Sequence, residues 1–322
     1  MMVARFGWMA VAILFVLVFG GAALAQSAEP VAVLTEIKKG GQGGEIRVKA
    51  VGQDEWRTPQ PLMSLGSGDE IRVKGDAAKA VIVYTGGATQ TITKANSPFK
   101  ITKPTAATST RQVAGIFGGM AQFLLGKEKE PVYTQLSTRS LKKDNEIQLT
   151  ILSPRETRLL PSQVKFAWVG PDTSKYSIKV YGPKGVAWSA SDVAREAIPY
   201  PDSAPKLSPG VRYRWELKTA DALPERAQFE IVSDQEWQRI NSQLNSIKSS
   251  PGSETTTTLA RVALLFQERL YQSALDELQT AIAKDKNEPN LQFMLGHVYD
   301  RMGLREQAAE AFNVAQQLST SD

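Results

Sequence analysis

The chain has 322 residues and 42% of them are hydrophobic, so it is long enough to form two or three globular domains. Its 38 basic and 33 acidic residues are interspersed and give a formal net charge of +5. Such mild basicity is weak support for nucleic-acid binding, and no nucleic-acid partner is expected. The sequence contains no cysteine, which excludes disulfides, thiol nucleophiles and cysteine-ligated zinc.

Residues 1–25 have the pattern of a secretory signal peptide. Arg5 precedes an apolar run over 8–19, and Ala-Leu-Ala at 23–25 provides a small-residue cleavage site. We therefore expect cleavage before Gln26 and a periplasmic protein. The alternative is an uncleaved inner-membrane anchor, because the apolar segment has about the 20 residues that a membrane helix needs. The membrane is a partner only in that case.

Short β-type runs separated by glycine turns follow the signal segment. This alternation predicts a small all-β domain over residues 26–104. The expected strands are Ala32–Leu34, Glu45–Lys49, Glu70–Val73, Ala80–Tyr84 and Gln90–Thr93.

One part of this region has a recognisable order of residues. Trp56, followed by Leu-Gly-Ser-Gly-Asp-Glu-Ile at 65–71, resembles the FecR-like domain. Gly66 and Gly68 permit a turn with positive φ, and Asp69 is expected to bond the turn backbone. The apolar residues of the next strand are expected to face the core.

Residues 105–146 are predicted to be a linker that carries a short amphipathic helix. Apolar residues recur at helical spacing over 111–126, although three glycines inside this segment weaken the helix. We expect the helix to dock on one of the β-domains. The alternative is a nearly uncharged patch that faces a partner or a membrane surface.

A second β-type region over 147–232 predicts an antiparallel sandwich. Its expected strands are Ile147–Leu152, Val164–Trp168, Tyr176–Tyr181, Gly185–Trp188, Val211–Leu217 and Ala227–Val232. Leu-Ser-Pro-Gly at 207–210, followed by Tyr213 and Trp215, resembles a strand entry of fibronectin type III and related immunoglobulin-like folds. The resemblance implies that the Tyr213 hydroxyl bonds back to the upstream corner and that Trp168 packs from the facing sheet.

The aromatic residues of this second β-region have two possible uses. Most lie at alternating strand positions, which favours core filling over a sugar-stacking site. Trp188 and Tyr200 are the two aromatic residues of this region whose positions allow exposure to solvent.

Residues 233–322 are predicted to be helical. Ser233 and Glu236 form a capping box at the start of a connecting helix. Residues 257–318 then resemble two tetratricopeptide (TPR) repeats, with small residues where helices touch and large ones where gaps are filled. The matching positions are Leu295, Gly296, Tyr299, Gly303, Ala308, Phe312 and Ala315.

Two repeats are fewer than the about three that are usual for stability. We expect the connecting helix, the sandwich or a second copy of the chain, in a homo-oligomer, to supply the missing contact. Resemblance to TPR domains implies that the first helix of each repeat lines a concave, partner-binding surface. On the second repeat this surface would offer Phe293, His297, Asp300 and Arg301 to a protein partner.

Catalytic chemistry is not expected. His297 is the single histidine, so metal ligation by a histidine pair is excluded, and we expect it on a solvated helix face. The glycines at 40–44 precede a strand and not a helix, which does not match a dinucleotide-binding loop. We predict no catalytic, cofactor-binding or metal-binding residues.

The sequence therefore predicts a non-catalytic, exported envelope protein that acts as an adaptor through its TPR-like repeats. Its multidomain fold would combine two all-β domains with C-terminal all-α repeats. One alternative is binding of peptidoglycan or another glycan by the β-domains. Another is FecR-type envelope signalling.

Overall fold

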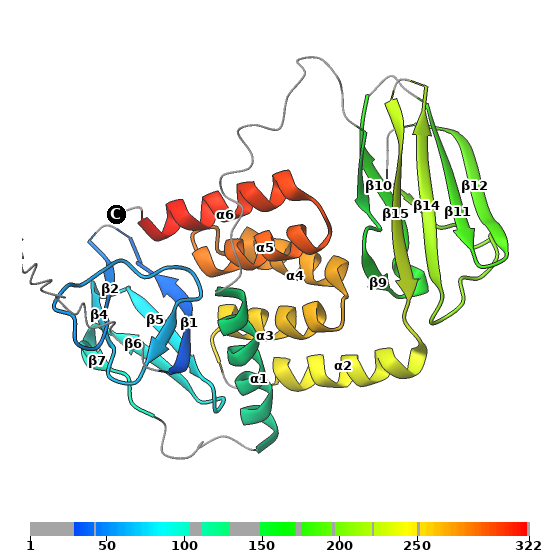
Figure 1. The fold of residues 1–322 in the computed structure, drawn as a ribbon. Helices are drawn as coiled ribbons and strands as arrows, with labels where there is room; N and C mark the ends of the chain where they lie inside the picture. Colours follow the sequence, from blue (N-terminus) through cyan, green and yellow to red (C-terminus); the bar gives the residue numbers. More distant parts are fainter. Residues whose placement is uncertain are drawn as a thin grey trace, which may run out of the picture.

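The computed structural model describes residues 29–41, 43–103, 111–128, 149–171, 175–194, 197–220, 222–249 and 252–320. Its N-terminal and central parts are built from β-sheets and its C-terminal part from helices, as expected from the sequence (Figure 1). The predicted signal segment lies outside the described residues. Within the described residues, no helix combines the length and apolar character needed to cross a bilayer.

The N-terminal β-domain consists of two antiparallel sheets, with strand orders β3-β1-β5-β6 and β2-β4-β7. Each strand predicted for this region is present, whereas β3 and β7 are very short and had no predicted counterpart. The strands are β1 Pro30–Lys38, β2 Glu45–Lys49, β3 Ser64–Gly66, β4 Glu70–Lys74, β5 Lys79–Tyr84, β6 Thr89–Thr93 and β7 Phe99–Lys100.

The glycine turn before β4 is held by Asp69, as predicted. The Asp69 carboxylate accepts hydrogen bonds from the Gly66 amide at 2.8 Å and the Val51 amide at 2.9 Å. Gly68 has a φ of +98°, but Gly66 ends β3 without a positive φ, so the expected left-handed turn residue is confirmed only at Gly68. Ile71 of the following strand is buried.

Strand β1 is buried on both faces, and this places the N-terminal β-domain against the helices. Leu34 packs between the two sheets of the domain. Val33 points the other way and joins Leu62 and Val83 in the apolar core of the C-terminal helices. The two faces follow from the alternation of side chains along a strand.

Helix α1 (Arg111–Glu128) packs on the N-terminal β-domain and also on the C-terminal helices (Figure 1). Phe117, Met120 and Leu124 are buried there, so the expectation that this helix docks on a β-domain is confirmed. Gly118 permits the close approach, because a Cβ on it would lie 2.6 Å from the Thr85 carbonyl oxygen. The rest of the predicted linker lies outside the described residues.

The central β-domain has two sheets, with strand orders β13-β10-β8 and β12-β11-β14-β15-β9. The sheets share one apolar core. The strands are β8 Thr150–Ser153, β9 Thr157–Leu159, β10 Lys165–Val169, β11 Tyr176–Gly182, β12 Gly185–Val193, β13 Ile198–Pro199, β14 Arg212–Thr219 and β15 Ala222–Ile231.

The prediction of a fully antiparallel central domain is wrong at one strand. After β8 the chain turns through residues 154–156 into the other sheet, and β9 then runs parallel to β15. The Tyr213 hydroxyl accepts a hydrogen bond from the Ser208 amide at 2.8 Å, as expected. Trp168 packs across the core on Tyr176, with ring centres 5.3 Å apart.

The aromatic residues of the central domain serve its core. Trp188 stacks on Phe166 at 5.5 Å between ring centres, and Tyr200 lies at 6.5 Å from the same ring. Both residues are half-buried. Core filling is therefore the better interpretation of this cluster.

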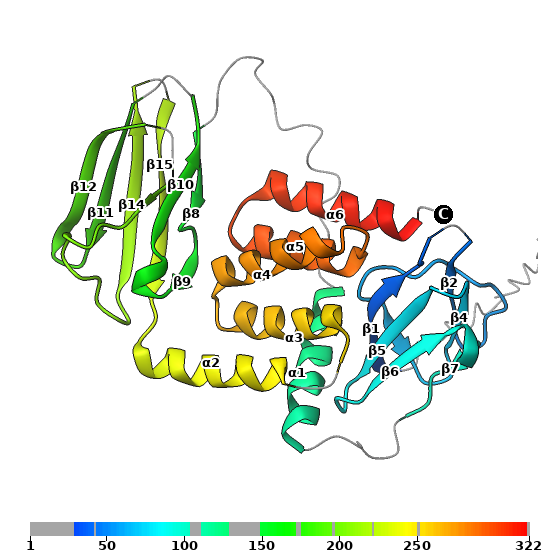
Figure 2. The ribbon, with the colours of Figure 1, turned by 180° about the vertical axis from the view of Figure 1, so that it is seen from behind.

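The C-terminal part is a layer of helices that lies between the two β-domains (Figures 1 and 2). The predicted capping box is present, since the Ser233 hydroxyl accepts from the Glu236 amide and the Glu236 carboxylate from the Ser233 amide. The helices are α2 Asp234–Lys248, α3 Glu254–Gln267, α4 Tyr271–Lys284, α5 Pro289–Arg301 and α6 Arg305–Thr320.

Helices α3 and α4 form one helical hairpin, and α5 and α6 form another. Gly296 has the role expected of it, because a Cβ there would lie 2.5 Å from the Phe312 ring. Ala308 and Ala315 of α6 are also buried. Helix α2 packs on α3 and supplies one of the contacts that two hairpins lack.

Candidate functional site

The candidate site, called the inner surface below, is the part of α3 and α5 that contacts β1, the nearby Leu62 and α1 at one set of residues and α6 at another. Residues 290, 293, 297 and 301 follow one another at helical spacing and share one face of α5. The inner surface is formed by Thr256 and Phe266 of α3 and by Asn290, Phe293, His297, Asp300 and Arg301 of α5.

Two of the predicted partner-binding residues pack against α6. The rings of Phe293 and His297 lie 4.8 Å apart, and each also contacts Phe312, at 5.4 Å and 5.1 Å. His297 is 3% exposed, so the expectation of a solvated histidine is wrong. The physical reason is Gly296, which lets the Phe312 ring approach α5 and cover its neighbour.

The other two predicted residues lie at the C-terminal end of α5. Asp300 is half-buried and Arg301 is exposed. The Arg301 guanidinium lies 5.8 Å from the centre of the Phe266 ring on α3. Phe266 in turn packs on Phe123 of α1 at 5.3 Å. The structure thus brings Arg301 and α1 together on one aromatic residue.

The N-terminal β-domain occupies the opposite end of the inner surface. The Leu62 amide donates to the Asn290 side chain at 2.6 Å. Thr35, in a β-bulge of β1, hydrogen-bonds Thr256 at 3.0 Å between hydroxyl oxygens. A bulge redirects one side chain of a strand, which explains how Thr35 reaches a helix. These contacts are buried.

Glu288 is the central polar group of this contact. Its carboxyl group accepts from the Ile37 amide at 3.1 Å and from the Asn290 amide at 3.2 Å, and it is 1% exposed. Burial raises the pKa of Glu288 to about 8, against the opposing effect of these two hydrogen bonds. The carboxyl group is therefore mostly protonated at neutral pH.

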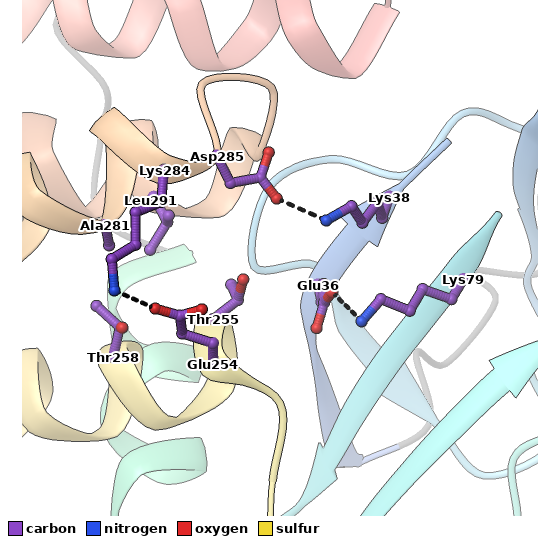
Figure 3. Close-up of a pocket in the computed structure, with 10 residues that line it drawn as sticks. All are labelled: Glu36, Lys38, Lys79, Glu254, Thr255, Thr258, Ala281, Lys284, Asp285 and Leu291. Carbon is purple, nitrogen blue, oxygen red and sulfur yellow. Dashed lines mark hydrogen bonds and ion pairs between the residues drawn. The ribbon is translucent and has the colours of Figure 1, made fainter. Parts of the chain in front are cut away.

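A cavity of about 230 Å³ lies between β1 and β5 on one side and α3 to α5 on the other (Figure 3). Three ion pairs line it, with N–O distances of 3.1, 2.7 and 2.6 Å. They are Lys38–Asp285, Lys79–Glu36 and Lys284–Glu254. The charges around the cavity balance, and the Lys38–Asp285 pair joins the N-terminal β-domain to the helices, whereas the other two pairs each lie within one of these parts.

The helices contact the central β-domain through a second polar group. Arg158 is bonded to Glu230 at 3.1 Å and to Glu236 at 2.7 Å. The Arg155 guanidinium donates to the Met302 carbonyl at 2.7 Å. The hydrogen bond from Arg158, then those from Ser233, lower the pKa of Glu236 to about 2.

Sequence reasoning missed the residues that make the closest contacts, namely Thr256, Glu288 and Asn290. A signal was present, because Glu288 precedes Pro289, and an acceptor followed by proline is typical of a helix start. That signal locates the start of α5 but does not identify the strand that meets it.

Within the described ranges, no three acidic or histidine side chains are placed to hold a metal ion. Each lysine that lines the cavity is paired with a carboxylate. No protein-family model matches the chain, and a comparison with curated proteins finds no match.

Proposed function

We propose that this chain is a non-catalytic adaptor of the bacterial cell envelope, exported through residues 1–25, that binds a protein partner through its C-terminal helices. The observation that carries this proposal is that the inner surface already holds two segments. It holds β1 by polar contacts at the starts of α3 and α5, and α1 by apolar contacts with α3. Strands and amphipathic helices are common forms of bound peptides.

At the level of families, the proposal combines a FecR-like domain, a fibronectin-like sandwich and two TPR-like repeats. The Asp69 turn supports the first and the Tyr213 corner supports the second. The fit of Phe312 against Gly296 supports the third.

In this adaptor the inner surface is divided along its length. β1 covers the N-terminal end and α1 covers the part around Phe266. Asp300 and Arg301 remain accessible at the C-terminal end, while Phe293 and His297 lie behind them against α6. The protein partner therefore contacts this end, where charges of both signs lie beside an aromatic core.

In-cell photo-crosslinking tests the proposed contact. A photoreactive amino acid replaces Asp300 in one variant and Leu223, which is 88% exposed on the central β-domain, in a matched control. We expect one discrete protein adduct from position 300 and none from 223. An Arg301→Glu change in the first variant should reduce the adduct.

No adduct at position 300, or the same adduct at both positions, would contradict the proposal. Point variants are preferable to removal of α3–α6, because these helices cover Val33 and Val83 of the N-terminal β-domain. Mass spectrometry of the periplasmic fraction tests export, and a mature chain that begins at Gln26 is the expected result.

Glycan binding by the β-domains stays an alternative with less support. Trp188 and Tyr200, the residues available for sugar stacking, pack on Phe166. Sedimentation of the purified chain with cell-wall sacculi tests it, and co-sedimentation would favour it over the adaptor proposal.

A further inference from the structure

The outward face of the β2-β4-β7 sheet carries a surplus of positive charge. Ile46, Val48, Ile71 and Val73 point inward to the core of the N-terminal β-domain, so the alternate residues point outward. The outward charged residues are Glu45, Arg47, Lys49, Glu70, Arg72, Lys74 and Lys100.

The two carboxylates of this face are already used. Glu45 pairs with Arg47 at 2.8 Å and with Lys74 at 2.9 Å. Glu70 pairs with Lys49 at 3.2 Å. Within the part of the chain that the structure describes, Arg72 has neither an ion pair nor a hydrogen bond.

Arg72 occupies an unfavourable position for an unpaired cation. It lies directly opposite Arg47 in the strand register, and like charges in such a pair repel each other. Its guanidinium carbon lies 4.3 Å from the ring centre of Trp56, and its Nε is buried with no acceptor. The Lys49 ammonium is 5.2 Å from the same ring.

Packing alone explains a single cation on an aromatic ring, because the face of the ring attracts positive charge. Arg214 on the Tyr181 ring, at 5.4 Å, is an example in the central β-domain. Its cross-strand neighbours are Tyr181 and Gln228, which carry no positive charge. Arg72 differs because Arg47 and Lys49 lie beside it and already use the two carboxylates of this face, which leaves the charge of Arg72 without a counter-ion among the described residues.

We propose that Arg72, with Arg47 and Lys49, binds a carboxylate of an acidic peptide segment on this face. A planar guanidinium matches a carboxylate with two parallel hydrogen bonds. The peptide is favoured over an acidic sugar, because the guanidinium covers the Trp56 face on which a sugar ring would stack. Lys100, beyond Glu70 on the neighbouring strand, extends the row of cations for a second acidic side chain.

Isothermal titration of the purified chain tests this site, with a short oligoglutamate peptide as the probe. We expect binding that weakens with added salt and falls on the order of tenfold in Arg72→Gln. Arg214→Gln is the matched control and should leave the affinity unchanged. Arg72→Lys keeps the positive charge and the packing but cannot form the two parallel hydrogen bonds of a guanidinium, so it should also weaken binding. This second variant keeps the test valid if Arg72→Gln misfolds.

Oligogalacturonate and inorganic phosphate are the comparison probes. Tighter binding of either than of the peptide would overturn the assignment to an acidic peptide. Absence of peptide binding, or equal affinities in the wild type and both Arg72 variants, would overturn the site itself. This site is remote from Asp300 on α5, so its failure leaves the proposed adaptor contact intact.

Discussion

The helices hold the two β-domains in different ways. The N-terminal β-domain contributes Val33, Leu62 and Val83 to the core of the helices, and α1 adds Phe117. By contrast, the central β-domain contributes Val232 to this core and otherwise meets the helices through polar groups, among them Arg158 and Arg155. An apolar, shared core unfolds with its neighbours, whereas polar interfaces within a chain resemble transient contacts. The N-terminal β-domain and the helices therefore form one unit with a shared core, called the fused body below, and the central β-domain is attached to it.

Deleting an apolar side chain from the shared core should have the largest effect. Phe117→Ala should destabilise the fused body by about 3–5 kcal/mol, because it removes a fully buried ring. Calorimetry should show a lower transition temperature for this body and an unchanged transition for the central β-domain. Leu223→Ala is the exposed control, and an equal shift of both transitions would contradict the comparison.

Glu288 gives the next largest effect, and it depends on pH. Its folded pKa, about 8, lies above the usual 4.5, so its stabilising contribution is complete below pH 4.5 and is lost as the pH rises through 8. Glu288→Gln keeps the shape without the charge and should flatten the fall in stability between these values. Denaturant unfolding at a series of pH values measures this, with the exposed Glu254→Gln as control.

Removing Arg158 should loosen the attached domain without unfolding the fused body. Arg158→Met leaves Glu230, Glu236 and Glu268 without their shared cation and should cost about 1–2 kcal/mol. It should also reduce the acid sensitivity that comes from Glu236, whose lowered pKa stabilises the fold above pH 4.5 and ceases to do so as the pH falls through about 2. The hydrogen bonds from Ser233 should keep part of this effect. Hydrogen exchange at the start of α2 measures the loosening. Unchanged exchange rates there would show that the contact between the central β-domain and the helices does not depend on Arg158.

The smallest effect is expected at the rim of the cavity. Lys38→Gln removes an ion pair with Asp285 in which the Lys38 side chain is 47% exposed, so the loss of stability should be below about 1 kcal/mol. The loss should vanish in high salt. A larger loss of stability that does not depend on salt would mean that the ion pair at the cavity rim, and not the apolar core, joins the N-terminal β-domain to the helices.

Local patterns were sufficient to predict most of the elements. The glycine turn at Asp69, the Tyr213 corner and the Ser233 capping box are each fixed by residues a few positions apart. The short strand β9 was not predicted, and its parallel pairing with β15, which lies far along the chain, makes the central β-domain depart from the antiparallel prediction.

The candidate site was predicted less well than the fold. Helical spacing placed Phe293 and His297 on one face, but it carried no information on Phe312, which covers them. The contact between Thr35 and Thr256 depends on a bulge and on the packing of distant segments. Contacts between distant segments produce no periodic pattern in the sequence, so they could not be predicted from it.

The dual burial of β1 also constrains the order in which the molecule is completed. A ribosome makes β1 and α1 long before α3 and α5, the helices that cover them. Val33, Leu62 and Phe117 consequently stay open to solvent, or to a chaperone, until the last quarter of the polypeptide has emerged. A stop codon placed after α2 would leave this apolar surface permanently exposed to solvent. Premature termination should therefore cause the truncated chain to aggregate and not to form a smaller functional protein.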